Sequence, residues 1–243
     1  MIKESELLLI LPTINEKDNL EILIPRILNL ELDIEILIVD DGSTDGSLEF
    51  LRSLQTQNVK IQFISRTKRM GIGSAHTVGL NFALDNGFRF AITMDADCSH
   101  APEYIPELLN LLKFNSYDIV LTSRFLDKNS INEWNLIRNA LTRLGHVLTF
   151  VFLRTKNDVT SGMRGYKVSE IDIEMLSWLK ETSYDFFPKI FYYYRKKKKN
   201  IAEVSIILPK RVYGSSKMNL KLIILNVFSI IFLPINYRIK IRK

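Results

Sequence analysis

The first 95 residues contain four short, largely apolar runs that alternate with segments of helical spacing. The runs occupy residues 7–11, 34–39, 59–64 and 88–94, and the helical segments occupy residues 18–30, 44–54 and 71–84. Apolar runs of this length are typical of strands that are covered on both faces. Strands that alternate with helices in this way predict a parallel, doubly wound α/β sheet with flanking helices.

Polar residues follow three of these predicted strands directly. They lie at residues 12–16, 40–43 and 95–97. The strands of a parallel sheet all end at one edge, and ligands bind in the crevice outside the carboxyl ends of the strands. We therefore expect these three segments to surround a single pocket.

Carboxylates are the main reactive groups of the expected pocket. Asp95 and Asp97 are one residue apart, and oxygen donors at this spacing can hold a divalent cation that also binds phosphate oxygens. Asp40 and Asp41 can accept hydrogen bonds from a base or a ribose. Each pair taken alone is also typical of a solvated turn or a helix cap. Their shared position at strand ends favours a ligand site.

Regular patterns continue less evenly in the second half of the chain. Residues 118–121 and 201–208 are predicted strands, and residues 134–153 are a predicted, mostly apolar amphipathic helix. The only low-complexity piece is the basic run at residues 195–199.

An apolar segment at residues 220–235 is followed by a basic tail. Its sixteen residues fall just short of the roughly 17 to 25 that a membrane-spanning helix needs. A place in the membrane interface, or docking on a membrane partner, is therefore favoured over an ordinary buried helix. We expect a catalytic domain over residues 1–218 and a membrane-association segment over residues 219–243.

Charge is distributed unevenly along the chain. From Arg195 to the end there are thirteen Lys or Arg and one acid, a net charge of +12, which leaves −6 for the first 194 residues of a chain whose total is +6. A basic end indicates an anionic partner, either nucleic acid or an anionic lipid surface. No aromatic residues are interleaved with the lysines, so we expect no nucleic acid. The single cysteine, Cys98, excludes a disulfide framework.

Four motifs together resemble the family-2 inverting glycosyltransferases. They are residues 11–16 (LPTINE), 39–46 (VDDGSTDG), 94–100 (MDADCSH) and 211–217 (RVYGSSK). Within that superfamily, residues 6–218 are similar to the dolichol-phosphate mannosyltransferases. The resemblance implies a GT-A fold, a divalent metal ion (Mg²⁺ or Mn²⁺) and a nucleotide diphosphate sugar as donor.

The resemblance also implies roles for individual residues on the donor side. Asp95 and Asp97 engage the metal and the diphosphate, Ser99 belongs to the same loop, and Arg124 faces the phosphates. The residues implied to surround the nucleotide are Pro12, Asn15, Glu16, Asp40 and Asp41.

On the acceptor side, the resemblance implies that Arg138 and Thr142 bind the acceptor phosphate. Arg211 and Lys217 belong to a loop that closes over donor and acceptor, and with Asp97 and Arg124 they make up the expected catalytic set. A phosphate acceptor is already ionised and needs only positioning and charge screening. Arginines suit that task because they bind phosphate in a bidentate manner.

Two segments depart from the family pattern. Ile14 stands where the family has an aromatic residue that stacks on the base, and residues 183–188 lack the usual Gln or Glu pattern. Asp185 is a candidate general base if the acceptor is a sugar hydroxyl.

These features predict an enzyme that transfers mannose from GDP-mannose to a polyprenyl or dolichyl phosphate at the cytoplasmic surface of a membrane. One alternative is a UDP-sugar-dependent transferase, for example a glucosyltransferase, that acts on polyprenyl phosphate or on a cell-surface glycan. A second is a non-catalytic membrane-surface binding module. The sequence leaves open whether a membrane-anchoring subunit is a further partner.

Overall fold

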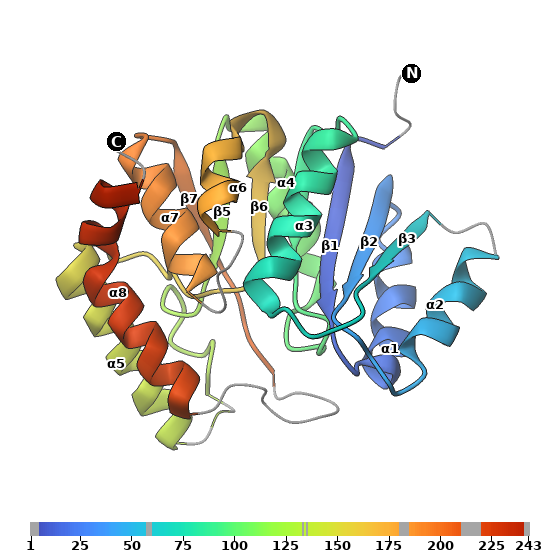
Figure 1. Ribbon diagram of the computed structural model, residues 1–243, viewed down its shortest axis with the longest axis horizontal. Helices are drawn as coiled ribbons and strands as arrows, with labels where there is room; N and C mark the ends of the chain where they lie inside the picture. Colours follow the sequence, from blue (N-terminus) through green and yellow to red (C-terminus); the bar gives the residue numbers. More distant parts are fainter. Residues whose placement is uncertain are drawn as a thin grey trace.

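A seven-stranded sheet forms the centre of the protein in the computed structural model (Figure 1). The structure describes residues 5–56, 60–132, 134, 136–179, 185–209 and 220–240, with side chains at 224–239 in the last range. The strand order is β3-β2-β1-β4-β6-β5-β7. Strand β6 is antiparallel to both of its neighbours, and every other adjacent pair is parallel.

Strands and helices alternate along most of the chain. The strands are β1 (Leu7–Thr13), β2 (Ile34–Asp40), β3 (Ile61–Ser65), β4 (Phe90–Thr93), β5 (Ile119–Ser123), β6 (Arg164–Lys167) and β7 (Ile201–Ser205). The α-helices are α1 (Lys17–Leu28), α2 (Ser47–Gln55), α3 (Ile72–Asp85), α4 (Ile105–Phe114), α5 (Leu136–Leu153), α6 (Ile173–Leu179), α7 (Phe186–Lys196) and α8 (Leu220–Lys240). Two short 3₁₀ helices are η1 (Pro102–Tyr104) and η2 (Val168–Glu170).

Side chains of the central strands alternate between two apolar cores. Leu8 and Ile10 of β1 join the core built with α3, α6, α7 and α8. Leu7, Leu9 and Leu11 join the core built with α1 and α4. Because both faces are covered, β1 can be apolar at consecutive positions, which is why its run was readable in the sequence.

The expected doubly wound, mostly parallel GT-A sheet is confirmed. The predicted strands and helices of the first 95 residues are present, although Val59 lies outside the described residues. Strand β6 and helices α4, α6 and α7 were not predicted. The predicted strand at residues 201–208 ends earlier, at Ser205.

Helix α8 covers residues 220–240 and is longer than the apolar segment at 220–235 that the sequence indicated. It packs against α5 and α7 beyond the β7 edge of the sheet (Figure 1). Its buried side chains Ile230, Leu233 and Tyr237 belong to the same core as α6 and α7. Among the described residues, one helix is long and apolar enough to cross a membrane by length and composition, and that helix is α5.

Candidate active site

The loops that follow β1 and β2 are interlocked at the carboxyl edge of the sheet, the edge at which β1, β2 and β4 end. The backbone N–H of Asn15 donates to the Ser43 hydroxyl at 2.8 Å, and the N–H of Thr44 donates to Asn15 Oδ1 at 2.8 Å. Asn15 has a φ of 52°, in the left-handed region that asparagine tolerates better than most residues. These hydrogen bonds join the two loops, as expected from their shared position at the carboxyl edge of the sheet.

Asp40 and Asp41 are both buried and take up different partners. Asp40 accepts hydrogen bonds from the N–H groups of Gly42 and Ser43 and from the Ser43 hydroxyl, which shapes the turn after β2. Asp41 accepts from the N–H groups of Met70 and Gly71 at 2.7 and 2.8 Å. The structure therefore gives each of them a role in building the loops, and nucleotide contact stays a prediction.

Arg66 completes the environment of Asp41 through an ion pair at 2.9 Å in which both side chains are less than 10% exposed. Burial lowers the pKa of Arg66, and the charges of Asp41 and Asp40 oppose this. This pair joins the end of β3 to the turn after β2, and sequence reasoning did not identify it.

Asp95 and Asp97 lie directly after β4, where the sequence placed them. Asp97 is buried and accepts hydrogen bonds from the backbone N–H and the hydroxyl of Ser99, at 3.0 and 2.5 Å. Asp95 is more open, with 28% of its side chain exposed, and its Oδ2 lies 3.6 Å from His100 Nδ1. Cys98 has a φ of 57°, so the backbone turns sharply between the pair Asp95 and Asp97 and the hydroxyl of Ser99.

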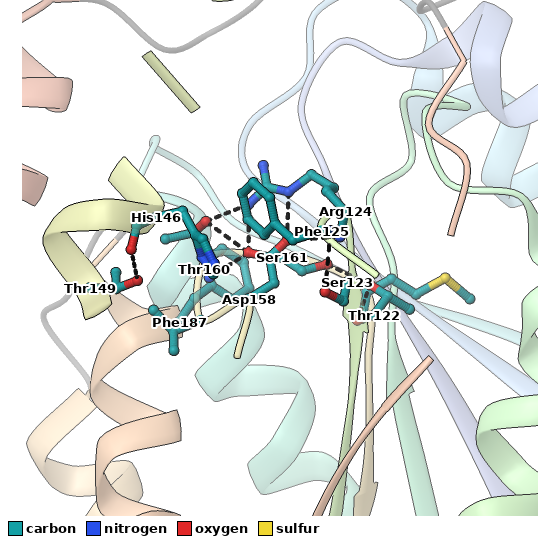
Figure 2. Close-up of polar contacts among 12 residues, drawn as sticks. Thr122, Ser123, Arg124, Phe125, His146, Thr149, Asp158, Thr160, Ser161 and Phe187 are labelled. Atoms are coloured by element: carbon teal, nitrogen blue, oxygen red, sulfur yellow. Dashed lines mark hydrogen bonds and ion pairs between the residues drawn. The ribbon is translucent and has the colours of Figure 1, made fainter. Parts of the chain in front are cut away.

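Arg124, just after β5, is held by a bidentate ion pair with Asp158 (Figure 2). Its Nε and Nη2 donate to the two Asp158 oxygens at 2.7 Å each, and Asp158 is buried. Burial alone would lower the pKa of Arg124, but the Asp158 carboxylate raises it, with a further contribution from Asp95. Burial alone would raise the pKa of Asp158, but Arg124 holds it below its usual value. Both groups are charged, and Arg124 lies within electrostatic reach of Asp95.

Residues 158–164 were missed by sequence reasoning and lie at the same edge. Because β6 is antiparallel, its amino end meets the carboxyl ends of its neighbours, with Arg164 opposite Thr93 and Leu121. A search limited to residues after strands cannot find a segment that precedes one. The sequence feature that could have identified this segment is the polar, glycine-containing stretch DVTSGMRG at residues 158–165.

Gly162 and Arg164 position this segment. A Cβ on Gly162 would lie 3.0 Å from Asp95 Oδ2, so the backbone packs directly against the Asp95 carboxylate. Arg164 is fully buried and donates to the carbonyl oxygens of Ser161, Phe187 and Val159 at 2.9, 2.9 and 2.6 Å. Arg164 thereby fastens the segment to the first turn of α7.

Helix α5 carries the two residues predicted to bind the acceptor phosphate. Arg138 is exposed, and its Cζ lies 3.6 Å from the centroid of the Trp134 ring, while Thr142 is half-buried one turn later. His146, one turn further on, stacks on Phe125 with ring centroids 3.8 Å apart (Figure 2). Phe125 follows Arg124 in sequence, so α5 is linked to the arginine of the site.

The remaining predicted residues are placed only in part. Pro12 is half-buried near the end of β1, which extends to Thr13 and so includes the first residues that the sequence placed after the strand. Glu16 is half-buried in the loop after β1 and accepts a hydrogen bond from Asn19 at 2.6 Å. Arg211 and Lys217 lie outside the described residues. Asp185 pairs with Lys189 and accepts a hydrogen bond from Ser229 at 3.1 Å, and its use as a general base stays untested.

A divalent ion fits the chemistry of this edge. The described residues include no group of three or more His, Cys, Asp or Glu side chains arranged to hold a metal. Asp95 and Asp97 offer hard oxygen donors, and the exposed part of Asp95 is open to a further ligand. Mg²⁺ is often bound by one or two carboxylates together with substrate phosphates, so the donor set suits an ion that is shared with a diphosphate.

The chain matches the family model described as glycosyl transferase family 2 over residues 8–172. An undecaprenyl-phosphate mannosyltransferase of Micrococcus luteus is 28% identical over 87% of both chains. A polyprenol monophosphomannose synthase of Mycolicibacterium smegmatis is 29% identical over 87% of this chain and 80% of that protein.

Solved structures share the fold at lower identity. Glucosyl-3-phosphoglycerate synthase from Mycobacterium tuberculosis, in complex with Mn²⁺, UDP and glucosyl-3-phosphoglycerate, has a TM-score of 0.68 at 17% identity and covers 96% of this chain and 80% of its own. A mannosyltransferase from Pyrobaculum calidifontis, in complex with GDP-mannose and Mn²⁺, has a TM-score of 0.55 at 16% identity and covers 96% and 70%.

Proposed function

Because this chain belongs to glycosyl transferase family 2, we propose that it transfers mannose from GDP-mannose to a polyprenyl or dolichyl phosphate with inversion at the anomeric carbon. The observation that carries the proposal is the carboxyl edge of the sheet, where Asp95 lies within electrostatic reach of the positively charged Arg124 and Asp97 belongs to the same loop as Asp95. The two polyprenyl-phosphate mannose enzymes that resemble the chain along 87% of its length support the choice of sugar and acceptor.

Asp95 and Asp97 would hold a Mg²⁺ or Mn²⁺ ion at the donor diphosphate, and Ser99 keeps Asp97 oriented. The ion would supply positive charge that stabilises the departing diphosphate. Arg124 supplies a second positive charge, and Asp158 fixes its direction through two hydrogen bonds. The ends of β1 and β2 and the loops that follow them receive the nucleotide, through Pro12, Asn15, Glu16, Asp40 and Asp41.

The chemical step forms one bond and breaks one bond. An oxygen of the acceptor phosphate attacks the anomeric carbon, and the bond from that carbon to the diphosphate breaks, with the electron pair leaving on GDP. Since the attacking phosphate is already ionised, no side chain has to remove a proton. The chain's task is to hold the two reactants in line and to screen their charges, for which Arg138, Thr142, Arg211 and Lys217 are the proposed acceptor-side groups.

The reaction takes place at the surface of a membrane, because a polyprenyl chain is confined to a bilayer. We assign it to the cytoplasmic face because the single cysteine suits a reducing compartment. The predicted membrane-association segment at 219–243, which contains the apolar residues 220–235 and the basic tail, provides association with that membrane.

The test is incubation of the purified protein with radiolabelled GDP-mannose or UDP-glucose, Mg²⁺ or Mn²⁺, and polyprenyl phosphate. We expect mannose label in the organic phase, released by mild acid, and none with UDP-glucose. The Asp97→Asn variant, checked for an unchanged melting temperature, should lose that label. Label from UDP-glucose alone, label on a water-soluble glycan, or full activity of Asp97→Asn would contradict the proposal.

A further inference from the structure

Helix α5 faces the solvent with its apolar side, the reverse of what is usual for a helix on a soluble domain. Two of its polar side chains lie against the protein, with His146 stacked on Phe125 and Thr149 buried, while Arg138 and Arg143 are exposed. The outward side chains are mostly large and apolar, and each of the following is at least 45% exposed: Leu136, Ile137, Leu141, Leu144, Val147, Phe150 and Val151.

Helix α8 lies beside α5 (Figure 1). It carries an apolar stripe of its own. Its opposite side is buried through Ile230, Leu233 and Tyr237. Exposed side chains recur at intervals of three or four residues along one face: Leu225, Phe228, Phe232, Ile235 and Ile239. The outward sides of α5 and α8, which we call the α5–α8 face, together expose these large apolar side chains. Exposed apolar patches rimmed by polar residues mark sites of membrane or protein interaction.

The charged side chains of helices α5 and α8 themselves are all basic. Neither helix contains an Asp or a Glu over residues 136–153 or 220–240. Arg195 donates to the carbonyl oxygen of Leu153 at the end of α5. Lys196 lies over the Tyr192 ring, which packs against Tyr237 of α8. Exposed basic residues at or near these helices are Arg143, Arg154, Lys156, Arg195, Lys196 and Arg238.

We propose that the α5–α8 face lies in the headgroup region of an anionic lipid bilayer, with both helices parallel to the membrane plane. An apolar stripe bordered by basic residues is the pattern of helices that bind such surfaces. Helix α5 lies in the plane because its other side packs against the catalytic domain through His146 and Leu153. A second copy of the chain fits less well, since two such faces would bring basic residues together without an acid on either helix.

This inference deepens the proposed function, on which its consequence for the acceptor rests. Arg138 and Thr142 are on α5, so a bilayer at the outward side of this helix brings a lipid-linked phosphate to the level of these residues. Sequence reasoning assigned membrane contact to residues 219–243. The structure assigns an equal part to α5, which is distant in sequence.

The test measures binding of the full chain to sedimented vesicles of phosphatidylcholine with or without phosphatidylglycerol, in the absence of substrates. Phe150→Glu on α5 and Phe228→Glu on α8 should each weaken binding by about tenfold, since each puts a charge in place of an exposed aromatic side chain that the bilayer would cover. Phe114→Glu is the matched control, because Phe114 is 72% exposed on α4, away from the face. It should bind as the wild type does, and circular dichroism should show that all three variants are folded.

Three results would overturn the proposal: unchanged binding of both Phe150→Glu and Phe228→Glu, equal binding to neutral and anionic vesicles, or a lipid-free dimer that Phe150→Glu dissociates. Vesicle binding does not require turnover, so the proposed membrane face and the proposed mannose transfer can each fail without the other. Normal vesicle binding without mannose transfer would defeat the proposed function and keep the membrane face.

Discussion

Arg124 has two of its three guanidinium nitrogens bonded to Asp158, so its direction at the site is set by a buried carboxylate. Asp95 is also supported, because its carboxylate packs against the backbone of Gly162. Both supports come from residues 158–162, ahead of β6. At the residue scale, the groups expected to contact substrate therefore depend on one segment that belongs to none of the four family motifs.

Replacing Asp158 by Asn should destabilise the protein by about 3 kcal/mol, because it leaves a buried Arg124 without its counter-charge. Urea unfolding at pH 7 measures this free energy of unfolding. Glu103→Gln is the control, since Arg26 and Glu103 pair at 2.8 Å with both side chains more than a third exposed. Such an exposed pair contributes about 1 kcal/mol or less. Equal losses in the two variants would contradict the buried role of Asp158.

The same ion pair predicts a pH dependence. The pKa of Asp158 is lowered in the folded protein, against about 3.9 in the unfolded chain. The contribution of the ionised Asp158 carboxylate to the free energy of unfolding is therefore fully present above about pH 4 to 5. It is lost as the pH falls through the pKa of Asp158 in the folded protein. The stability difference between wild type and Asp158→Asn should be constant from about pH 6 to 8 and should shrink in acid.

Gly162→Ala should impair metal-assisted catalysis while leaving the fold intact. The new Cβ would come within about 3.0 Å of the Asp95 carboxylate and force it to shift. A displacement of a few tenths of an ångström at a ligand should raise the Mn²⁺ concentration for half-maximal activity by about tenfold.

Gly145→Ala is the control for Gly162→Ala, because a Cβ at position 145 on α5 meets nothing within 4 Å. It should stabilise the helix slightly without changing the metal requirement. If both variants reached half-maximal activity at the same Mn²⁺ concentration, Gly162 would have no role in the site.

At the element scale, α5 joins the site to the proposed membrane face. Its inner side contacts Phe125 through His146, and its outer side is apolar and exposed. Burial lowers the pKa of His146, with Asp158 opposing and Arg124 adding to the effect. The ring is therefore neutral near pH 7 and acts through stacking.

His146→Ala should raise the KM for the lipid phosphate more than the KM for the nucleotide sugar, because the ring pair positions the helix that carries Arg138 and Thr142. His146→Phe keeps an aromatic ring for the stack and should restore acceptor KM. Steady-state kinetics with each substrate varied in turn provides the measurement. If both KM values rose equally, or if Phe failed to rescue, the positioning role of His146 would be wrong.

Strands that are buried on both faces could be predicted from the sequence. The antiparallel strand β6 and the orientation of helix α5 could not. The apolar runs of β1 and β2 and the acids that follow them identified the sheet edge and its carboxylates. Strand β6 starts with a buried arginine and a glycine, Arg164 and Gly165, so it lacks an apolar signature. Periodicity found α5 but could not tell which of its sides faces the protein, because a membrane-facing side is apolar as well.

At the scale of the whole molecule, the charge of the chain is divided between two regions. The last part of the sequence, from Arg195, carries +12, and the rest carries −6. The basic run after α7 and the end of α8 are brought together by the rings of Tyr192 and Tyr237. The acids of the catalytic edge lie after β2 and β4, on other elements. An anionic bilayer would attract the basic region, while the acids at the carboxyl edge of the sheet would hold a divalent cation and the diphosphate bound to it.

The central claim is that Asp95 and Asp97 bind a nucleotide diphosphate through a divalent ion. Calorimetric titration of GDP into the protein, with Mn²⁺ or with EDTA, tests it most directly. Mn²⁺ should raise the affinity by about tenfold or more in the wild type and in Asp85→Asn, whose exposed acid ends α3, and should have no effect in Asp97→Asn. Equal GDP affinity with and without Mn²⁺, or a full Mn²⁺ effect in Asp97→Asn, would contradict the account.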